Sequence, residues 1–449
     1  MRKRGGNDGA RVKVVFVEFQ NYIKNKQGNV IVITALVLPV ILMVVGGVAD
    51  LSRVLQVRSR LQDAVDVASI GSIAVNSQAY KTAMAMGNGD IPVGVTQAQS
   101  IFSSNYVVTS ELSAVTLAAK VSKSSTIVTS IVTVTANYRP YLLGLIGIKS
   151  LPITVTSTSM SSMPPYIDFY LLLDNSPSMG VGATTSDINT MVANTSDKCA
   201  FACHETDLPG KDYYALAAKL GVTKRIDVVR QATQNLMTTA TKTETLPTQY
   251  RVAIYDFGVY ANSIDQKAPA AYQVSALTSN LTQSASDASA VDLMIMPSPG
   301  YNNDSQTNLT SELSSMNSTM PTPGNGNGSG SPQEVLFMVS DGTNDGYDCG
   351  YNNGNTCRRI TPIDTTVCTA IKNRGIRIAM LYTTYLPLPT NGFYNTYLAK
   401  YVSAPSQLAT AMQNCASPGL YFEVSPSQGI SSAMTSLFNS VISVVRISS

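Results

Sequence analysis

Apolar runs of strand length alternate with amphipathic segments over the second half of the chain. Five such runs occupy residues 167–173, 250–257, 334–340, 376–383 and 421–424. Apolar residues at helical spacing predict helices at 223–242, 308–317, 362–375, 406–416 and 428–446. Because continuous apolar strands that alternate with helices are typical of a parallel sheet covered on both faces, residues 166–449 are predicted to form a doubly wound, mostly parallel α/β domain. Two stretches break the alternation and are interpreted as insertions, residues 180–222 and the glycine-rich connector 321–332.

The first half of the chain has a different pattern. Residues 29–49 contain no charged residue, and their length matches a helix that spans a bilayer. Residues 50–76 continue with apolar residues at helical spacing, and 94–107 form a candidate short helix. Residues 113–159 are rich in Val and Thr, and their alternation predicts antiparallel strands. We therefore expect a transmembrane anchor at 29–49, then a helical stalk with a small α+β region over 50–162, which ends at the boundary 161–165.

The positive charge lies beside the predicted span. Residues 1–28 form a basic tail with Arg and Lys at seven positions against Asp8 and Glu18. This placement indicates a tail next to a membrane rather than a nucleic-acid surface, and it predicts a cytoplasmic N-terminus with the bulk of the chain outside. A cleavable signal peptide is the alternative, with Gly47 and Ala49 near its end, but its apolar core is shorter, about 7–15 residues. We expect the anchor to be retained.

All six cysteines lie in the exported part, at positions 199, 203, 349, 357, 368 and 415. An even number in an oxidising compartment predicts disulfides, although the sequence does not choose among the 15 pairings that six cysteines allow. Short loops favour Cys199–Cys203 and Cys349–Cys357, which leaves Cys368–Cys415. Cys199, Cys203 and His204 also form C-x-x-x-C-H, one residue longer than the motif that attaches c-type haem. Haem attachment and free thiols are therefore the alternatives for this pair.

Polar side chains follow two of the predicted strands. Asp174, Ser176 and Ser178 come after the run 167–173, and Asp341 comes after the run 334–340; Thr307 lies in a loop between the two runs. Parallel sheets place ligand sites at the carboxyl ends of their strands. Carboxylates and hydroxyls without His or Cys are ligands suited to Mg²⁺ or Mn²⁺. Taken singly, each segment is also a common turn or helix cap, and Thr310 is an alternative to Thr307.

The order D-x-S-x-S, then Thr, then an apolar strand that ends in S-D-G resembles the von Willebrand factor A domain, over residues 166–446. The resemblance implies a metal-ion-dependent adhesion site with Ser176, Ser178 and Thr307 as hydroxyl ligands. It further implies that Asp174 and Asp341 act largely through waters, and that a partner protein's carboxylate fills the open position.

The N-terminal half resembles the TadG-like proteins of Tad (Flp) pilus assembly. The resemblance is carried by QGNVIVITALVLPVILMVVGGVADLSRVLQVRSRLQDAVDVASI and YLLGLIGIKSLPITVTSTS, and CAFACH and ISVVRISS match the subset with a von Willebrand A domain. It implies a single-pass protein of the bacterial inner membrane with its bulk in the periplasm, surface exposure being the alternative. Residue 33, five after Gly28, is Ile where pilins have Glu, which argues against prepilin-peptidase processing.

These observations predict a binding and assembly protein rather than an enzyme. Its expected partner is a pilus or secretion-system protein that supplies a carboxylate, and neither nucleic acid nor a small-molecule substrate is expected. His204 is the only histidine and has no neighbouring Ser-Asp arrangement, so no Ser-His-Asp triad is indicated, and no glycine-rich phosphate loop follows a strand. The alternatives are a surface adhesin with the same metal chemistry, a haem redox protein, and a metal-dependent hydrolase with Asp345 as its base.

Overall fold

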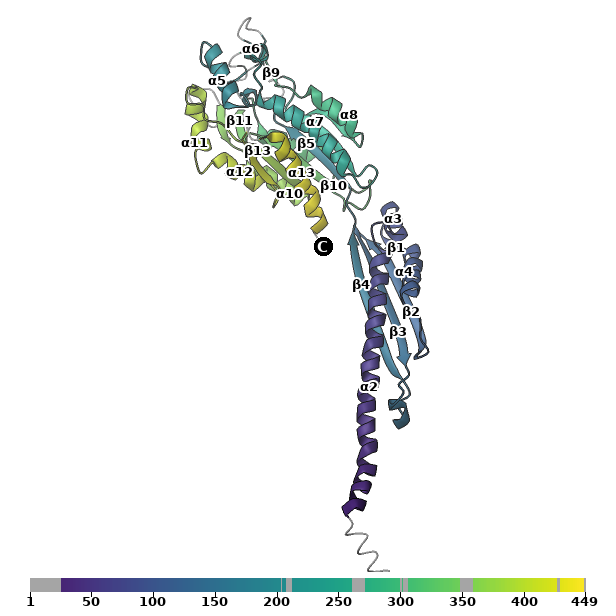
Figure 1. Ribbon diagram of the computed structural model, residues 1–449. Helices are drawn as coiled ribbons and strands as arrows, with labels where there is room; N and C mark the ends of the chain where they lie inside the picture. The colour runs from purple at the N-terminus through teal and green to yellow at the C-terminus, as the bar shows by residue number, and fades with distance from the viewer. Residues whose placement is uncertain are drawn as a thin grey trace, which may run out of the picture. The chain divides into compact units, whose positions relative to one another are not determined.

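The computed structural model describes residues 26–202, 204–206, 212–260, 271–298, 301, 306–347, 358–425 and 429–447. The chain divides into two compact units (Figure 1). The first contains the residues up to 83 together with 88–161, and the second contains 84–87 and 162–449.

The first unit is built on one long helix, α2 (Lys26–Ser72), which is 47 residues long and has Pro39 in its interior. The predicted span and the predicted stalk helix are therefore parts of one continuous helix. Its N-terminal part is long and apolar enough to cross a membrane, and its side chains there are almost all exposed. This agrees with a single-pass membrane anchor.

The outer part of α2 packs on a small sheet, as the sequence predicts. The four-stranded sheet has the order β1 (Gly89–Asp90), β2 (Leu112–Ser124), β3 (Ile127–Tyr138) and β4 (Leu151–Ser162). Helix α4 (Pro92–Asn105) covers it together with α2. Leu61 and Val65 of α2 and Phe102 of α4 lie in the same core as Val132 and Val134 of β3, because the apolar stripe of α2 faces the sheet. The short helix α3 (Gln78–Ala85) was not predicted.

The second unit is a doubly wound sheet, which confirms the predicted fold class. Its strands lie in the order β14 (Tyr421–Val424), β13 (Arg377–Thr383), β10 (Gln333–Ser340), β5 (Ile167–Leu173), β7 (Tyr250–Asp256) and β8 (Tyr272–Thr278). Every neighbouring pair is parallel except β7 and β8, which are antiparallel. The edge strand β8 was not predicted, since most of its side chains are partly or fully exposed and its apolar pattern is weak.

Helices cover both faces of this sheet, and alternate residues of β5 point to each. On one face, Phe169 and Leu171 share a core with α7 (Arg225–Thr243), α8 (Leu281–Asp287) and α13 (Ile430–Ile447). On the other face, Tyr170 and Leu172 share a core with α9 (Leu309–Thr319), α10 (Thr365–Asn373) and α12 (Gln407–Cys415). The sheet is therefore buried on both sides, and its polar chemistry gathers where the strands end.

The stretch 180–222 has secondary structure of its own. It contains α5 (Thr185–Asn194), β6 (His204–Glu205) and α6 (Tyr213–Leu220), and β6 pairs with β9 (Ile295–Met296). The Thr184 and Asp187 side chains close a capping box at the start of α5. Residues 321–332 hold no helix or strand and connect α9 to β10.

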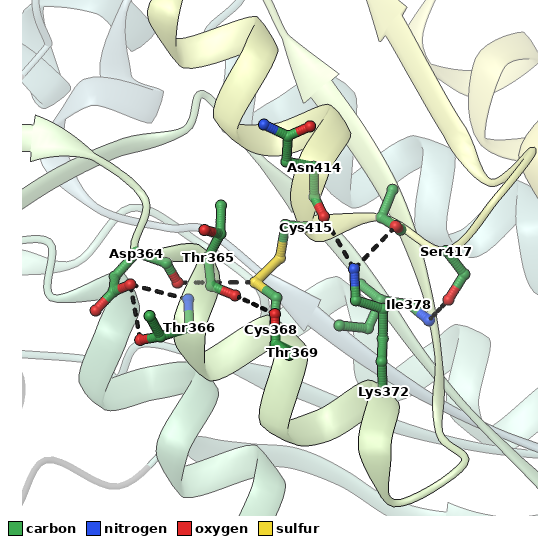
Figure 2. Close-up of a disulfide and its surroundings, with 11 residues drawn as sticks. Asp364, Thr365, Thr366, Cys368, Thr369, Lys372, Ile378, Asn414, Cys415 and Ser417 are labelled. Carbon is green, nitrogen blue, oxygen red and sulfur yellow. Dashed lines mark hydrogen bonds between the residues drawn. A yellow bond between two sulfur atoms is a disulfide. The ribbon is translucent and has the colours of Figure 1, made fainter.

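A disulfide joins Cys368 of α10 to Cys415 of α12, as Figure 2 shows. Both cysteines are fully buried, and beside them Lys372 Nζ donates a hydrogen bond to the Asn414 carbonyl at 2.9 Å.

The predicted pairing of Cys199 with Cys203 is not made, because Cys199 is a free thiol. Its Sγ donates to the Phe201 carbonyl at 3.5 Å, and burial raises the pKa of this thiol to about 11. Cys203, Cys349 and Cys357 lie outside the described residues.

Candidate metal-binding site

Two aspartates lie next to each other at the carboxyl edge of the sheet. Asp174 follows β5, which ends at Leu173, and Asp341 follows β10, which ends at Ser340. The two strands are neighbours in parallel register, and the Asp174 backbone N–H donates to the Val339 carbonyl at 3.0 Å. Ser340 Oγ also donates to Asp174 Oδ2 at 2.7 Å, and both aspartates are fully buried. The strand register therefore places both carboxylates at one edge, as the sequence predicts for parallel strands.

The loop after β5 folds Ser176 back onto Asp174 and brings Ser178 against Ser176. Asp174 Oδ1 accepts hydrogen bonds from the Ser176 backbone N–H at 3.0 Å and from Ser176 Oγ at 2.6 Å. Ser178 Oγ lies 3.1 Å from Ser176 Oγ, because Pro177 begins the short 3-10 helix η2 (Pro177–Gly180) directly after Ser176. Three oxygen-bearing side chains of the predicted set therefore lie in contact.

Thr307 reaches the same region through a backbone bridge. Its N–H donates to the Asp345 carbonyl at 3.1 Å, and the Asp345 N–H donates to the Thr307 carbonyl at 2.7 Å. Thr307 and Ser178 line one cavity, and the Thr307 hydroxyl makes no hydrogen bond to the described residues. Thr310 lines a different depression, beside Asn308 and Asn344. The geometry favours Thr307 over Thr310 as the hydroxyl of the candidate site.

The turn after β10 positions Asp341. Asp341 Oδ1 accepts from the Thr343 backbone N–H at 3.2 Å, while Oδ2 has no hydrogen-bond donor among the described residues. Gly342 has φ +74°, a left-handed conformation in which a Cβ would also meet the Met412 side chain at 2.9 Å. The S-D-G sequence therefore needs glycine at its third position.

A buried guanidinium that was not predicted from the sequence lies beside this carboxylate. Arg225 Nη1 is 3.7 Å from Asp341 Oδ2, and both side chains are fully buried. Arg225 also stacks over the Tyr385 ring at 4.7 Å and donates to the Thr384 carbonyl at 2.9 Å. A cation in the first turn of α7 opposes the helix dipole, and this was the available signal that Arg225 has a tertiary partner.

Two further buried acids lie near Asp174. Burial, together with the nearby charge of Asp341, raises the pKa of Asp174. Burial raises the pKa of Asp256, at the end of β7, to about 7. Burial raises the pKa of Glu312 to about 8, and the charges of Asp256 and Asp174 add to this effect. Among the described residues these carboxyl groups outnumber the guanidinium of Arg225, so the region favours an added cation.

Glu312 gives a prediction on pH and stability. Its folded-state pKa of about 8 lies above the ordinary value of 4.5, so the folded protein holds a proton that the unfolded chain releases as the pH rises. Between pH 4.5 and about 8, this group should therefore lower the free energy of unfolding by about 1.4 kcal/mol per pH unit. We expect Glu312→Gln to remove this share of the slope, measured by urea unfolding of the chelator-treated wild type and variant. Equal slopes in the two proteins would contradict the assignment.

Asn175 holds the first loop in place. Its Nδ2 donates to the carbonyls of Gly258 and Asp292 at 2.8 and 3.0 Å, and its Oδ1 accepts from the Phe257 N–H at 3.1 Å. The side chain is almost fully buried. It therefore ties the end of β5 to the end of β7, a role that depends on tertiary neighbours and has no local sequence signal.

A cavity of about 230 Å³ opens beside Ser178 and Thr307. Its other lining residues are Pro177, Cys199, Phe201, Glu205, Met296, Gln306, Thr343, Asp345, Arg358, Tyr385, Asn391 and Phe393. Apolar rings and polar groups thus adjoin the candidate ligands, which suits a protein side chain better than a bare ion.

The geometry bears on two of the alternative functions, the metal-dependent hydrolase with Asp345 as its base and the haem redox protein. The Asp345 carboxylate is engaged by Arg358, whose Nε donates to Oδ1 at 2.9 Å and whose Nη2 donates to Oδ2, so it forms an ion pair rather than a free base. His204 stacks on Tyr214 with ring centroids 4.4 Å apart. Cys203, which a haem linkage would require, lies outside the described residues.

The donor set fits a hard divalent cation. The described residues contain no group of three or more His, Cys, Asp and Glu able to hold a metal, so a thiolate or imidazole site is not formed among them. Carboxylate and hydroxyl oxygens come from Asp174, Ser176, Ser178, Thr307 and Asp341. Oδ2 of Asp341 is a buried acceptor that lacks a hydrogen-bond donor among the described residues, with Arg225 Nη1 3.7 Å away. As a metal site, this set stays a prediction.

Comparison with protein families gives a match at the N-terminus. Residues 28–72 match the Tad family, described as "Putative Flp pilus-assembly TadE/G-like". The match confirms the resemblance to TadG-like proteins over these residues. No curated protein matches the chain.

Three solved structures illustrate the similarities of the fold. The pilus adhesin SpaC from Lactobacillus rhamnosus GG is 11% identical with a TM-score of 0.34, over 73% of this chain and 34% of that one. The von Willebrand factor domain of the type V pili tip protein Mfa5 from Porphyromonas gingivalis is 9% identical with a TM-score of 0.35, over 64% and 99%. Proximal thread matrix protein 1 from the mussel byssus, with a zinc-occupied MIDAS motif, is 14% identical with a TM-score of 0.31, over 62% and 46%. The chain thus spans about a third of the SpaC structure, and the fold assignment rests on the strand order given above.

Proposed function

We propose that this chain, which is TadE/G-like over residues 28–72, is a membrane-anchored protein of Tad (Flp) pilus assembly that binds a partner protein through a divalent cation. The observation that carries the proposal is the convergence of Asp174, Ser176, Ser178, Thr307 and Asp341 at one sheet edge. Mg²⁺ is the proposed ion, with Mn²⁺ as the close alternative. The anchor is proposed to lie in the bacterial inner membrane, with the N-terminus cytoplasmic and the bulk periplasmic.

The incomplete ligand set supports binding rather than catalysis. Two carboxylates and three hydroxyls leave a coordination position for an oxygen from outside the chain. A carboxylate is the proposed group, since it adds a charge-assisted bond to the cation. The adjacent cavity, with Phe201 and Phe393 in its lining, would take an apolar side chain next to that acid.

The test is site-specific photocrosslinking in cells from Asn391, which lines the cavity. We expect a pilus or secretion-system protein to be crosslinked, to be lost when chelator is added to permeabilised cells, and to return with Mg²⁺. The matched control carries the crosslinker at Thr310, outside the cavity. A crosslink that persists in the presence of chelator would contradict the proposal. A crosslink to material outside the cell would favour the surface adhesin as the function instead of pilus assembly.

A further inference from the structure

An uncharged apolar loop projects from the first unit between β3 and β4. Residues 140–148 read PYLLGLIGI, and cations flank them at Arg139 and Lys149. The loop contains the 3-10 helix η1 (Leu143–Ile146). Its side chains are unusually exposed for their type: Leu145 is 82% exposed and Tyr141 70%, and Ile146, Leu142 and Ile148 are also exposed. We call residues 141–148 the apolar tip.

The apolar tip is tied to α2 at the outer end of the predicted span. The Asp50 carboxylate accepts hydrogen bonds from the backbone N–H groups of Tyr141, Leu142 and Leu143 at 3.1, 2.8 and 2.7 Å. Gly46 allows this approach, because a Cβ there would lie 2.8 Å from Leu142 Cδ1. Asp50 is the first charged residue after the uncharged stretch 29–49, so the tether fixes the tip at the height where the span ends.

The apolar tip continues the apolar surface of the span. Val44, Val45, Val48 and Leu51 of α2 are all more than half exposed in the same part of the unit. An exposed apolar patch of this kind marks a surface that contacts another protein or a membrane. Lipid suits it best, because the patch joins a surface that lipid already covers, and because Tyr141, Arg139 and Lys149 are residue types that favour the membrane interface and anionic headgroups.

We propose that residues 141–148 insert into the outer leaflet of the membrane as a second contact beside the α2 span. This inference rests on the proposed membrane anchor and goes beyond the proposed function of the second unit. The inserted tip would fix the rotation of α2 about its axis, because lipid would then be contacted by one defined face of the first unit.

The chain contains no Trp, which gives a direct test. The full chain with Leu145→Trp is reconstituted in vesicles whose lipids carry bromine on the acyl chains, and Trp emission is compared with that in unbrominated vesicles. We expect a loss of about half of the emission, because the indole would lie among the acyl chains. The matched control is Ile70→Trp, on an exposed α2 position about 30 Å further along the helix than Asp50, and it should not be quenched.

A third variant separates failure of the anchor from failure of the tip. Leu42→Trp lies within the span and should be quenched whenever the chain is inserted. Quenching of Leu42→Trp without quenching of Leu145→Trp overturns the inference and leaves the anchor intact. Absence of quenching in both variants would overturn the membrane anchor as well as the insertion of the apolar tip. Protection of Leu145→Trp from the brominated lipid and from an aqueous quencher alike would mean that a protein or a second copy covers the tip, which also overturns it.

Discussion

Replacing Asp174 by asparagine is expected to weaken Mg²⁺ or Mn²⁺ binding by roughly a hundredfold or more, since it removes one of the two carboxylates at the candidate site. The apo protein should not lose stability in the same measure. Asp174 is fully buried, and burial and Asp341 both raise its pKa, so its charge is unfavourable without a cation. The change should therefore separate cation binding from folding.

The measurement is a titration of chelator-treated full-length protein with Mn²⁺. Binding is monitored through the decrease of the electron paramagnetic resonance signal of the free ion. Thr310→Val is the matched control, because Thr310 lies near Thr307 in sequence and outside the cavity. Thr307→Val should weaken binding by about tenfold, as the loss of one hydroxyl ligand. Equal affinities for the wild type and Asp174→Asn would refute the assigned site.

Substitution of both candidate aspartates tests the proposed role in pilus assembly in cells. A strain with Asp174→Asn and Asp341→Asn, with the protein present at the wild-type level, should make fewer pili. Normal piliation in that strain would refute the proposed role in pilus assembly. The metal site would still be tested independently by the Mn²⁺ titration.

Much of the second unit could be predicted from sequence because burial on both faces leaves a simple pattern. Strand β5 is apolar over most of its length, and the residue that ends the run, Asp174, marks the sheet edge. Edge strand β8 escaped prediction for the opposite reason: solvent on its outer side removes the pattern. Helices α5 and α6 lie in residues 180–222, which were predicted from the sequence only as an insertion.

The residues missed at the site depend on contacts between distant segments. Asn175 acts through backbone groups near residues 257 and 292, which no local pattern brings together. Glu312 did leave a signal, because it lies on the same helical stripe as Leu309, Leu313 and Met316 of α9. An acid on an apolar stripe indicates a buried ionisable group, and such groups gather at functional sites.

Loss of the Cys368–Cys415 disulfide is expected to lower the free energy of unfolding by about 4 kcal/mol, since the bond closes a long loop in the unfolded chain. The two cysteines are 47 residues apart and fully buried. The test is chemical unfolding of the double variant Cys368→Ala, Cys415→Ala against wild type. Cys199→Ala is the matched control, because Cys199 is a free thiol and its loss opens no loop.

The disulfide should also affect the candidate site. Cys415 lies in α12 three residues after Met412, and the Met412 side chain packs beside Gly342 in the turn that positions Asp341. Releasing α12 from α10 should loosen that turn, so the double variant should bind Mn²⁺ more weakly while Cys199→Ala binds as the wild type does. Unchanged Mn²⁺ affinity in a double variant of lowered stability would show that the turn is held without the disulfide, because β10 and Arg225 would then suffice to position Asp341.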